Sequence, residues 1–318
     1  MNILVVGLGA LGTTFATLLK RSGHEVYGLT KAKYLASFAD NKVYLSGIWG
    51  DHEAVLDGVH ADIRPLLDNK PDLVILIVKS FDTEGTIKEI APLVGENTLV
   101  MVAQNGYGNY EAVARVVGKE HTLLSPILFG ARLLGVGRAE VTGIAGTVRL
   151  GQPEGAVPAA VCEKIAEAIN AAGIPTAYEP DVYGILWDKI LYNCALNPLG
   201  ALLECNYGCL VDDEGIRGVM NAMIREIFAV AKAHDIVLRW NHADDYIAYF
   251  YKELLPPTRQ HFPSTYQDLM AGKKLEIDAL TGAIVRLGKE KAVPVPVNET
   301  VTNLLKAKEL FSAKKKAS

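Results

Sequence analysis

The chain opens on an apolar run that leads straight into three closely spaced glycines, and this feature constrains the fold more than any other. Residues 3–7 are predicted to form a strand and residues 11–22 a helix. In such a turn the first glycine permits a tight bend, the second lets backbone approach a pyrophosphate, and the third lets the helix pack closely on the sheet. The predicted dinucleotide-binding residues are Gly7, Leu8, Gly9, Ala10, Leu11 and Gly12. A glycine turn in an unrelated α/β protein is the alternative interpretation.

Further apolar runs alternate with helical patterns along the first half of the chain. Strands are predicted at 25–29, 72–79 and 98–103, with a helix at 83–94 between the last two. Alternation of this kind predicts a parallel, doubly wound sheet. Residues 136–142 and 147–151 are expected to pair as a hairpin, with the turn at their intervening glycines.

The pattern changes after Glu179-Pro180, because almost everything beyond it is helical. The residue before a proline is biased away from helix, so this dipeptide is a natural boundary. The predicted fold class is α/β: an N-terminal Rossmann-type doubly wound sheet over 1–178, followed by an all-helical C-terminal domain over 179–318.

Charge and composition narrow the function classes. A formal net charge of −4 over 318 residues disfavours nucleic acid as a partner. The sequence has no apolar stretch of about 18 residues and no signal-peptide pattern, so we expect a cytoplasmic protein with no membrane span. Its 4 cysteines lack the companions that a metal site needs, and we expect no metal.

The end of the second predicted strand indicates which nicotinamide cofactor is bound. NAD-binding proteins usually place an acid there, on the ribose 2′-hydroxyl. This chain has Thr30-Lys31-Ala32-Lys33 instead. Lysines attract a 2′-phosphate, so the sequence predicts NADP(H) as the cofactor, with Lys31 as a binding residue. Ordinary surface lysines are the alternative.

Polar residues also follow two other predicted strands. Lys79 ends one apolar run, and Asn105 follows another. Ligands of open parallel sheets lie beyond the carboxyl ends of the strands, so both residues are candidate cofactor contacts. A solvated lysine and a turn asparagine are the alternatives.

One stretch of the helical half carries a polar stripe. Lys189, Asn193 and Asn197 are spaced i, i+4, i+8, which places them within about 80° of one another on a helix. Their neighbours are apolar, and buried polar groups need partners. A polar substrate would supply them, and so would hydrogen bonds to another helix; the spacing leaves both open.

Taken together, these motifs resemble the ketopantoate reductase (2-dehydropantoate 2-reductase) family over nearly the whole chain. The resemblance rests on the glycine motif, Lys79, Gln104-Asn105-Gly106, the K-x-x-x-N-x-x-x-N-P helix, and Ser264 followed by Glu276-Ile277-Asp278. It implies reduction of 2-dehydropantoate with NADPH to give pantoate for coenzyme A synthesis.

The resemblance also assigns catalytic and substrate-binding residues. Lys189 would be the general acid that protonates the developing alkoxide. Asn193, Asn197 and Ser264 would hold the substrate. Glu276 would lie near the nicotinamide ribose and the reacting lysine, as both a catalytic and a cofactor-binding residue.

For the cofactor, the resemblance implies that Lys79 and Asn105 line its cleft. It also implies that Ala131 contacts it through the backbone and that Lys31 recognises the 2′-phosphate.

One loop departs from the family pattern and keeps other interpretations open. Some relatives carry Asn-Gly after the lysine helix, where this chain has Tyr207-Gly208. A reductase of another small 2-keto or hydroxy acid is therefore an alternative, and a non-catalytic NADP(H)-sensing protein is a second. Tyr246, Tyr249, Phe250 and Tyr251 could form core or a dimer face, so the sequence does not fix the oligomeric state, for which a homodimer is the preference.

Overall fold

The computed structural model describes residues 1–317, which fall into two compact units. The first unit is Met1–Ile185, and the second begins at Leu186. The division lies within helix α6 (Val182–Leu203), whereas the boundary predicted from the sequence, after residue 178, precedes that helix.

A six-stranded sheet forms the centre of the first unit. Its strands are β1 (Asn2–Val6), β2 (Glu25–Leu29), β5 (Gly58–His60), β6 (Leu73–Leu76), β7 (Leu99–Val102) and β8 (Thr122–Leu124). They lie in the order β5-β2-β1-β6-β7-β8, and every neighbouring pair is parallel. The chain winds outward in one direction from β1 and then in the other from β6, which confirms the predicted doubly wound sheet. Ligands of such sheets bind at the carboxyl edge where the order reverses.

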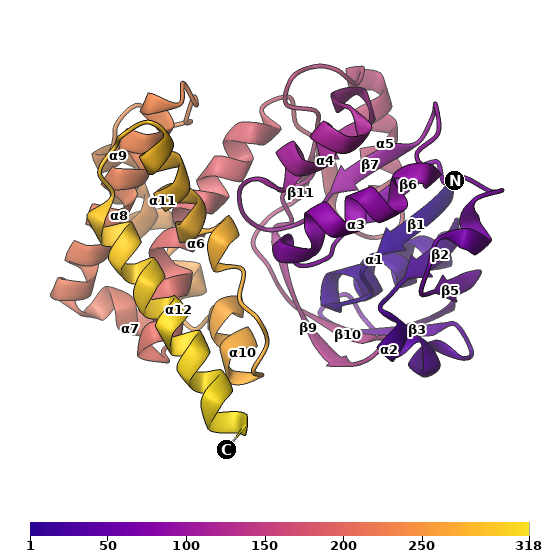
Figure 1. Cartoon of the computed structure of the whole chain (residues 1–318), viewed down its shortest axis with the longest axis horizontal. Coiled ribbons are helices and arrows are strands. Elements are labelled where there is room, and N and C mark those ends of the chain that lie inside the picture. The colour runs from indigo at the N-terminus through magenta and orange to yellow at the C-terminus, as the bar shows by residue number, and fades with distance from the viewer. Residues whose placement is uncertain (318) are drawn as a thin grey trace. The chain divides into compact units, whose positions relative to one another are not determined.

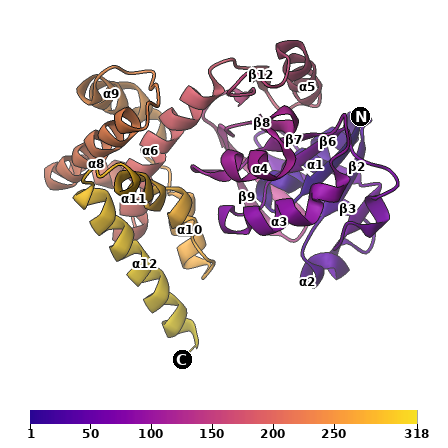
Figure 2. The same cartoon turned by 45° about the horizontal axis from the view of Figure 1, so that its top comes forward.

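Helices cover both faces of this sheet (Figures 1 and 2). They include α1 (Ala10–Arg21), α3 (Thr83–Ile90) and α4 (Asn109–Val117). Alternate residues of β1 enter different clusters: Val5 shares one with Phe15 of α1, and Val6 shares the other with Ile87 of α3. Burial on both sides explains why these strands are continuous apolar runs.

A second, four-stranded sheet in the first unit does not appear among the predictions. It has the order β4-β3-β10-β9. Its strands are β3 (Lys42–Gly47), β4 (His52–Val55), β9 (Phe129–Gly135) and β10 (Arg138–Ile144). Its inner side chains, among them Val43, Leu45 and Val141, belong to the same cluster as Phe15 of α1.

The predicted hairpin between 136–142 and 147–151 is wrong. Strand β10 pairs antiparallel with the preceding β9, and β11 (Val148–Leu150) pairs parallel with β12 (Thr176–Tyr178). The hairpin turn is Val136-Gly137, where Gly137 adopts φ +72°, a conformation that favours glycine in tight turns. Helix α5 (Ala159–Ala171) connects β11 to β12.

The second unit is helical, as the sequence predicts (Figure 1). Besides the end of α6 it contains α7 (Tyr207–Asp212), α8 (Glu214–Ala233), α9 (Ala243–Tyr249), α10 (Ser264–Met270), α11 (Thr281–Glu290) and α12 (Pro296–Ala317). Helix α6 is apolar on most sides: Trp187, Leu191 and Cys194 have no exposed surface. A helix of this kind belongs in the core of its unit, so its few polar residues need a specific explanation.

None of the helices in residues 1–317 combines the length and the hydropathy that crossing a membrane would require.

Candidate active site

The glycine motif forms a tight connection between β1 and α1. Gly7 adopts φ +98°, and a Cβ there would lie 3.0 Å from the carbonyl oxygen of Ile77. A Cβ on Gly12 would lie 1.9 Å from the carbonyl oxygen of Gly7, so only glycine allows the first turn of α1 to lie this close to the end of β1. A Cβ on Gly9 would meet nothing within 4 Å.

This geometry fits a pyrophosphate. Gly9 precedes the first turn of α1 without a side-chain cap, and N–H groups in the first turn of a helix have no acceptor within the helix. Such groups and the helix dipole attract anions. The open space beside Gly9 leaves room for the ligand. Leu8 points instead into the core, where it packs on Gly28 of β2, and can offer a ligand only backbone.

The lysine predicted to select the cofactor is held by an acid. Lys31 follows β2, and its Nζ lies 2.9 Å from Oδ2 of Asp82 in the turn after β6. The Lys31 side chain is 61% exposed, so this ion pair is weak and an incoming anion can compete for the lysine. Lys33 lies over the ring of Tyr34, 4.9 Å from its centroid.

A buried hydrogen-bond network, missed from the sequence, links the ends of β6 and β7. The Nε2 of Gln104 donates to the carbonyl of Val78 and to Oγ1 of Thr83, both at 2.7 Å. The Thr83 hydroxyl donates to Oδ1 of Asn109, whose Nδ2 donates to the carbonyl of Asn105. This network fixes the backbone on either side of Lys79 and at Asn105.

The remaining predicted cofactor residues of the first unit lie at strand ends or edges. Lys79 is half-buried directly before the turn at 80–82, and Asn105 is half-buried after β7. Ala131 lies in β9, an edge strand of the second sheet, opposite Val141 of β10.

In the second unit, Lys189 is the most unusual charged group. It projects from the apolar helix α6, and burial lowers its pKa to about 8, while the carboxylate of Glu276 opposes that shift. Glu276 is half-buried and precedes the short turn Ile277–Ala279. The sequence predicts both residues, and the structure brings them within electrostatic reach of each other.

The two asparagines of the stripe differ in their contacts. Asn197 is 4% exposed, and its Oδ1 accepts a hydrogen bond of 2.7 Å from the hydroxyl of Tyr207. Asn193 is half-buried, and its amide has no hydrogen-bond partner among residues 1–317. Tyr207, the residue that departs from the family pattern, therefore belongs to the stripe's surroundings; nothing in its sequence position indicates this.

Ser264 is positioned through the preceding proline. A Cβ on Gly200, one turn beyond Asn197 in α6, would lie 2.6 Å from Cγ of Pro263. This close approach brings the first residue of α10 beside the far end of the polar stripe. Ser264 is exposed there.

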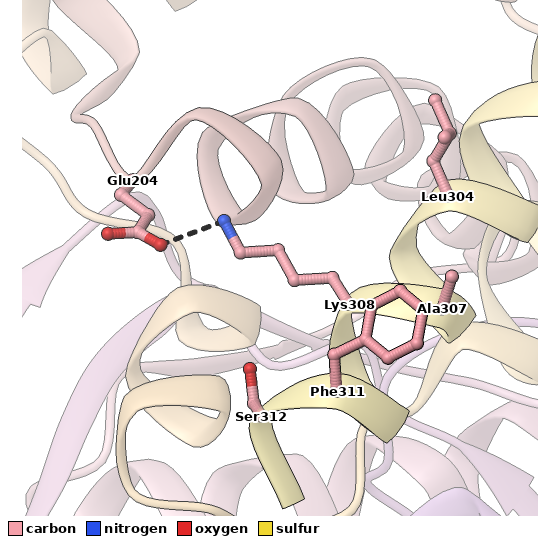
Figure 3. A pocket seen from close by; sticks show the side chains of 6 residues that line it. All are labelled: Glu204, Leu304, Ala307, Lys308, Phe311 and Ser312. Atoms are coloured by element: carbon pink, nitrogen blue, oxygen red, sulfur yellow. Dashed lines mark ion pairs between the residues drawn. The ribbon is translucent and has the colours of Figure 1, made fainter. Parts of the chain in front are cut away.

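A cavity of about 350 Å³ elsewhere in the second unit contains none of the predicted site residues (Figure 3). It is lined by Glu204, Leu304, Ala307, Lys308, Phe311 and Ser312. In Figure 3, Lys308 reaches across it to Glu204, with an Nζ–Oε1 distance of 2.9 Å, and its Nζ also donates to the carbonyl of Leu202. These contacts tie α12 to the end of α6.

Comparison with protein families matches both parts of the chain. Residues 3–155 match the family model described as ketopantoate reductase PanE/ApbA, and residues 181–309 match the model for the C-terminal part of the same family. A 2-dehydropantoate 2-reductase of Aquifex aeolicus is 44% identical over 315 residues, which cover 99% of each chain. A 2-dehydropantoate 2-reductase of Vibrio cholerae is 28% identical over 309 residues, covering 97% of this chain and 98% of the relative.

Solved structures agree with this comparison. A PanE/ApbA family ketopantoate reductase from Ralstonia eutropha superposes with a TM-score of 0.85 at 28% identity, covering 98% of this chain and 99% of the other. A D-mandelate dehydrogenase with NADH and anilino(oxo)acetate superposes with a TM-score of 0.86 at 25% identity and the same coverage.

The glycine geometry separates stability from ligand binding in two single-residue variants. We expect Gly12→Ala to lower the free energy of unfolding by about 1–3 kcal/mol or more, because its Cβ collides with backbone. We expect Gly9→Ala to melt like the wild type but to lose affinity for NADPH, because its Cβ enters the space where a pyrophosphate would lie. Thermal melting and fluorescence titration measure the two effects. Wild-type NADPH affinity in Gly9→Ala would contradict the assigned site.

Proposed function

The chain belongs to the ketopantoate reductase PanE/ApbA family and is an oxidoreductase; we propose that it reduces 2-dehydropantoate to pantoate with NADPH as hydride donor and Lys189 as proton donor. The full-length similarity to the Aquifex aeolicus reductase supports the reaction and the substrate. The observation that carries the mechanism is a lysine in an apolar helix whose pKa is lowered to about 8 beside a carboxylate.

Reduction of a ketone requires a hydride at carbon and a proton at oxygen. The nicotinamide supplies the hydride chemistry when it is bound. Lys189 supplies the proton: its ammonium polarises the carbonyl, and donation to the forming alkoxide gives the hydroxyl of the product. A pKa near 8 suits this task, because the group is largely protonated at neutral pH yet releases its proton more readily than an ordinary lysine.

Glu276 keeps Lys189 cationic in its dry surroundings. Burial alone favours the neutral amine, and the carboxylate offsets part of that effect. We assign Glu276 to this role and to orienting the ammonium. The proposed contact with the nicotinamide ribose comes from the family resemblance.

Asn193, Asn197 and Ser264 are the proposed substrate contacts. All three lie along or beside the face of α6 that carries Lys189. The free amide of Asn193 supports this assignment, because a half-buried amide without a protein partner favours a ligand that supplies one.

The nicotinamide-binding fold does not by itself select NADPH, since the D-mandelate dehydrogenase of the same fold is bound to NADH. We propose NADPH because Lys31 and Lys33 follow β2, where NAD-binding proteins carry an acid. The 2′-phosphate would compete with Asp82 for Lys31. Gly7–Gly12, Lys79, Asn105 and the backbone of Ala131 are the other proposed cofactor contacts.

The D-mandelate dehydrogenase likeness favours one second candidate, a reductase of another 2-keto acid on the same fold. A cofactor-sensing protein without turnover is less well supported, because sensing does not need an acid–base pair such as Lys189 and Glu276. Turnover with a panel of 2-keto acids distinguishes the three.

The proposed reaction is tested by oxidation of NADPH with 2-dehydropantoate, followed by absorbance. We expect Lys189→Ala to lower kcat by at least 10²-fold, because the proton donor is lost. Lys232→Ala removes an exposed lysine of α8 and serves as the matched control, with wild-type rates expected. An active Lys189→Ala enzyme would contradict the assigned acid, and a wild type that binds NADPH but leaves 2-dehydropantoate unchanged would contradict the substrate.

The pKa of Lys189 predicts how the rate of reduction depends on pH. Because the protonated form acts, kcat/KM should be constant below about pH 8 and should fall tenfold per unit above it. In Glu276→Gln the ammonium loses its stabilising charge, so the break should move to lower pH, on the order of one unit. A pH–rate profile of both enzymes measures this, and a break that moves upward would contradict the pairing.

The choice between NADPH and NADH is tested by removing the positive charge of Lys31 at the end of β2. We expect Lys31→Ala to weaken NADPH binding about tenfold and to leave NADH binding nearly unchanged, because only NADPH carries the 2′-phosphate. Titration with each cofactor gives both dissociation constants. Equal losses for the two cofactors would place Lys31 elsewhere than at the 2′-phosphate.

A further inference from the structure

Tyr207 occupies a position that the reaction as proposed does not use, yet it contacts a proposed substrate residue. Its ring is 3% exposed, and its hydroxyl donates a 2.7 Å hydrogen bond to Oδ1 of Asn197. Burial raises the pKa of Tyr207 well above its ordinary value, so the phenol keeps its proton and acts as a donor.

The surroundings of Tyr207 hold the phenol in place. Its ring packs edge-on against Tyr192, with centroids 5.8 Å apart, and lies 5.2 Å from the ring of His261. Its N–H donates to the carbonyl of His261, and the next N–H, of Gly208, donates to the carbonyl of Arg259. Asn206 caps the helix that Tyr207 begins, accepting from the N–H of Cys209. The hydroxyl therefore has one fixed direction.

This contact decides which end of the Asn197 amide is left for a ligand. An amide has one acceptor and one donor end, and their assignment follows from the hydrogen-bond network. Because Tyr207 donates, Oδ1 faces the phenol and Nδ2 is directed away from it. Nδ2 has no partner among residues 1–317 and is not fully enclosed. The end of Asn197 that is directed away from Tyr207 therefore carries the N–H donors.

We propose that Tyr207 is a positioning residue for substrate specificity: it fixes Asn197 as a donor, so that this site accepts a carboxylate and rejects the corresponding primary amide. The inference rests on the proposed function. With the ammonium of Lys189 on the same face, the stripe offers donors to the oxygens of a 2-keto acid. A primary amide would present its own N–H groups to the Nδ2 of Asn197. Two hydrogen-bond donors would then face each other, and neither would have an acceptor.

The test compares the binding of two ligands that differ only at this group. Pantoate and its primary amide are titrated by calorimetry into the enzyme saturated with NADP⁺, and 2-dehydropantoate turnover is measured separately. In the wild type we expect strong preference for pantoate. In Tyr207→Phe the Asn197 amide can rotate and offer Oδ1, so the ratio of the two dissociation constants should fall about tenfold. The loss for the acid substrate should appear in KM, with NADPH affinity unchanged.

Two further variants separate this role from a structural one. Asn197→Asp still accepts from Tyr207 but cannot donate, so it should bind the amide better than pantoate. Tyr192→Phe removes a neighbouring half-buried hydroxyl, which bonds Thr258 and not Asn197, and should keep the wild-type ratio.

The outcomes distinguish this inference from the reaction itself. A wild type that reduces 2-dehydropantoate, with a ratio that Tyr207→Phe leaves unchanged, would overturn the role of Tyr207 and leave the function standing. An equal change in Tyr192→Phe would also overturn it, because the effect would then be general to the packing. A wild type that neither binds pantoate nor reduces 2-dehydropantoate would overturn both.

Discussion

The contact between Gly12 and Gly7 is the constraint on which the first unit depends. A Cβ on Gly12 would overlap the carbonyl of Gly7, so α1 can start directly at the end of β1 only with glycine there. The first turn of α1 beside Gly9 has no side-chain cap, and Leu8 is buried over Gly28. One backbone contact thus serves both helix packing and the proposed anion site.

The second unit carries a costly feature, a half-buried charge on an apolar helix. Lys189 lies in a helix whose neighbouring residues Trp187 and Leu191 are fully buried, and desolvation pushes its pKa down to about 8. A hydrophobic residue at this position would be expected to stabilise the fold more, since burying an ionised group is costly. A lysine in this place with a carboxylate near it therefore favours a chemical role over a structural one.

Sequence reasoning succeeded where a single element carries the signal. Continuous apolar runs predict β1, β2, β6 and β7, and helical spacing predicts that Lys189, Asn193 and Asn197 share a face. It failed where pairing joins distant segments: β10 pairs with β3 across some 90 residues (Ala139 opposite Leu45), and the hairpin was assigned to the wrong neighbour. The Gln104–Thr83–Asn109 network and the Tyr207–Asn197 bond were missed for the same reason, since each depends on tertiary proximity that residue type does not reveal.

The two units offer a ligand different kinds of recognition. The first provides backbone N–H groups and an exposed lysine. Such groups bind a phosphate whatever molecule carries it. The second provides side-chain donors, and the hydrogen bond from Tyr207 to the oxygen of Asn197 directs the N–H groups of that amide away from the phenol. A 2-keto acid presents only acceptor oxygens at its reacting end, so a stripe of donors matches it without leaving a group unpaired. The carboxylate of Glu276 opposes the effect of burial on Lys189 and so favours the protonated state that the proposed reduction requires.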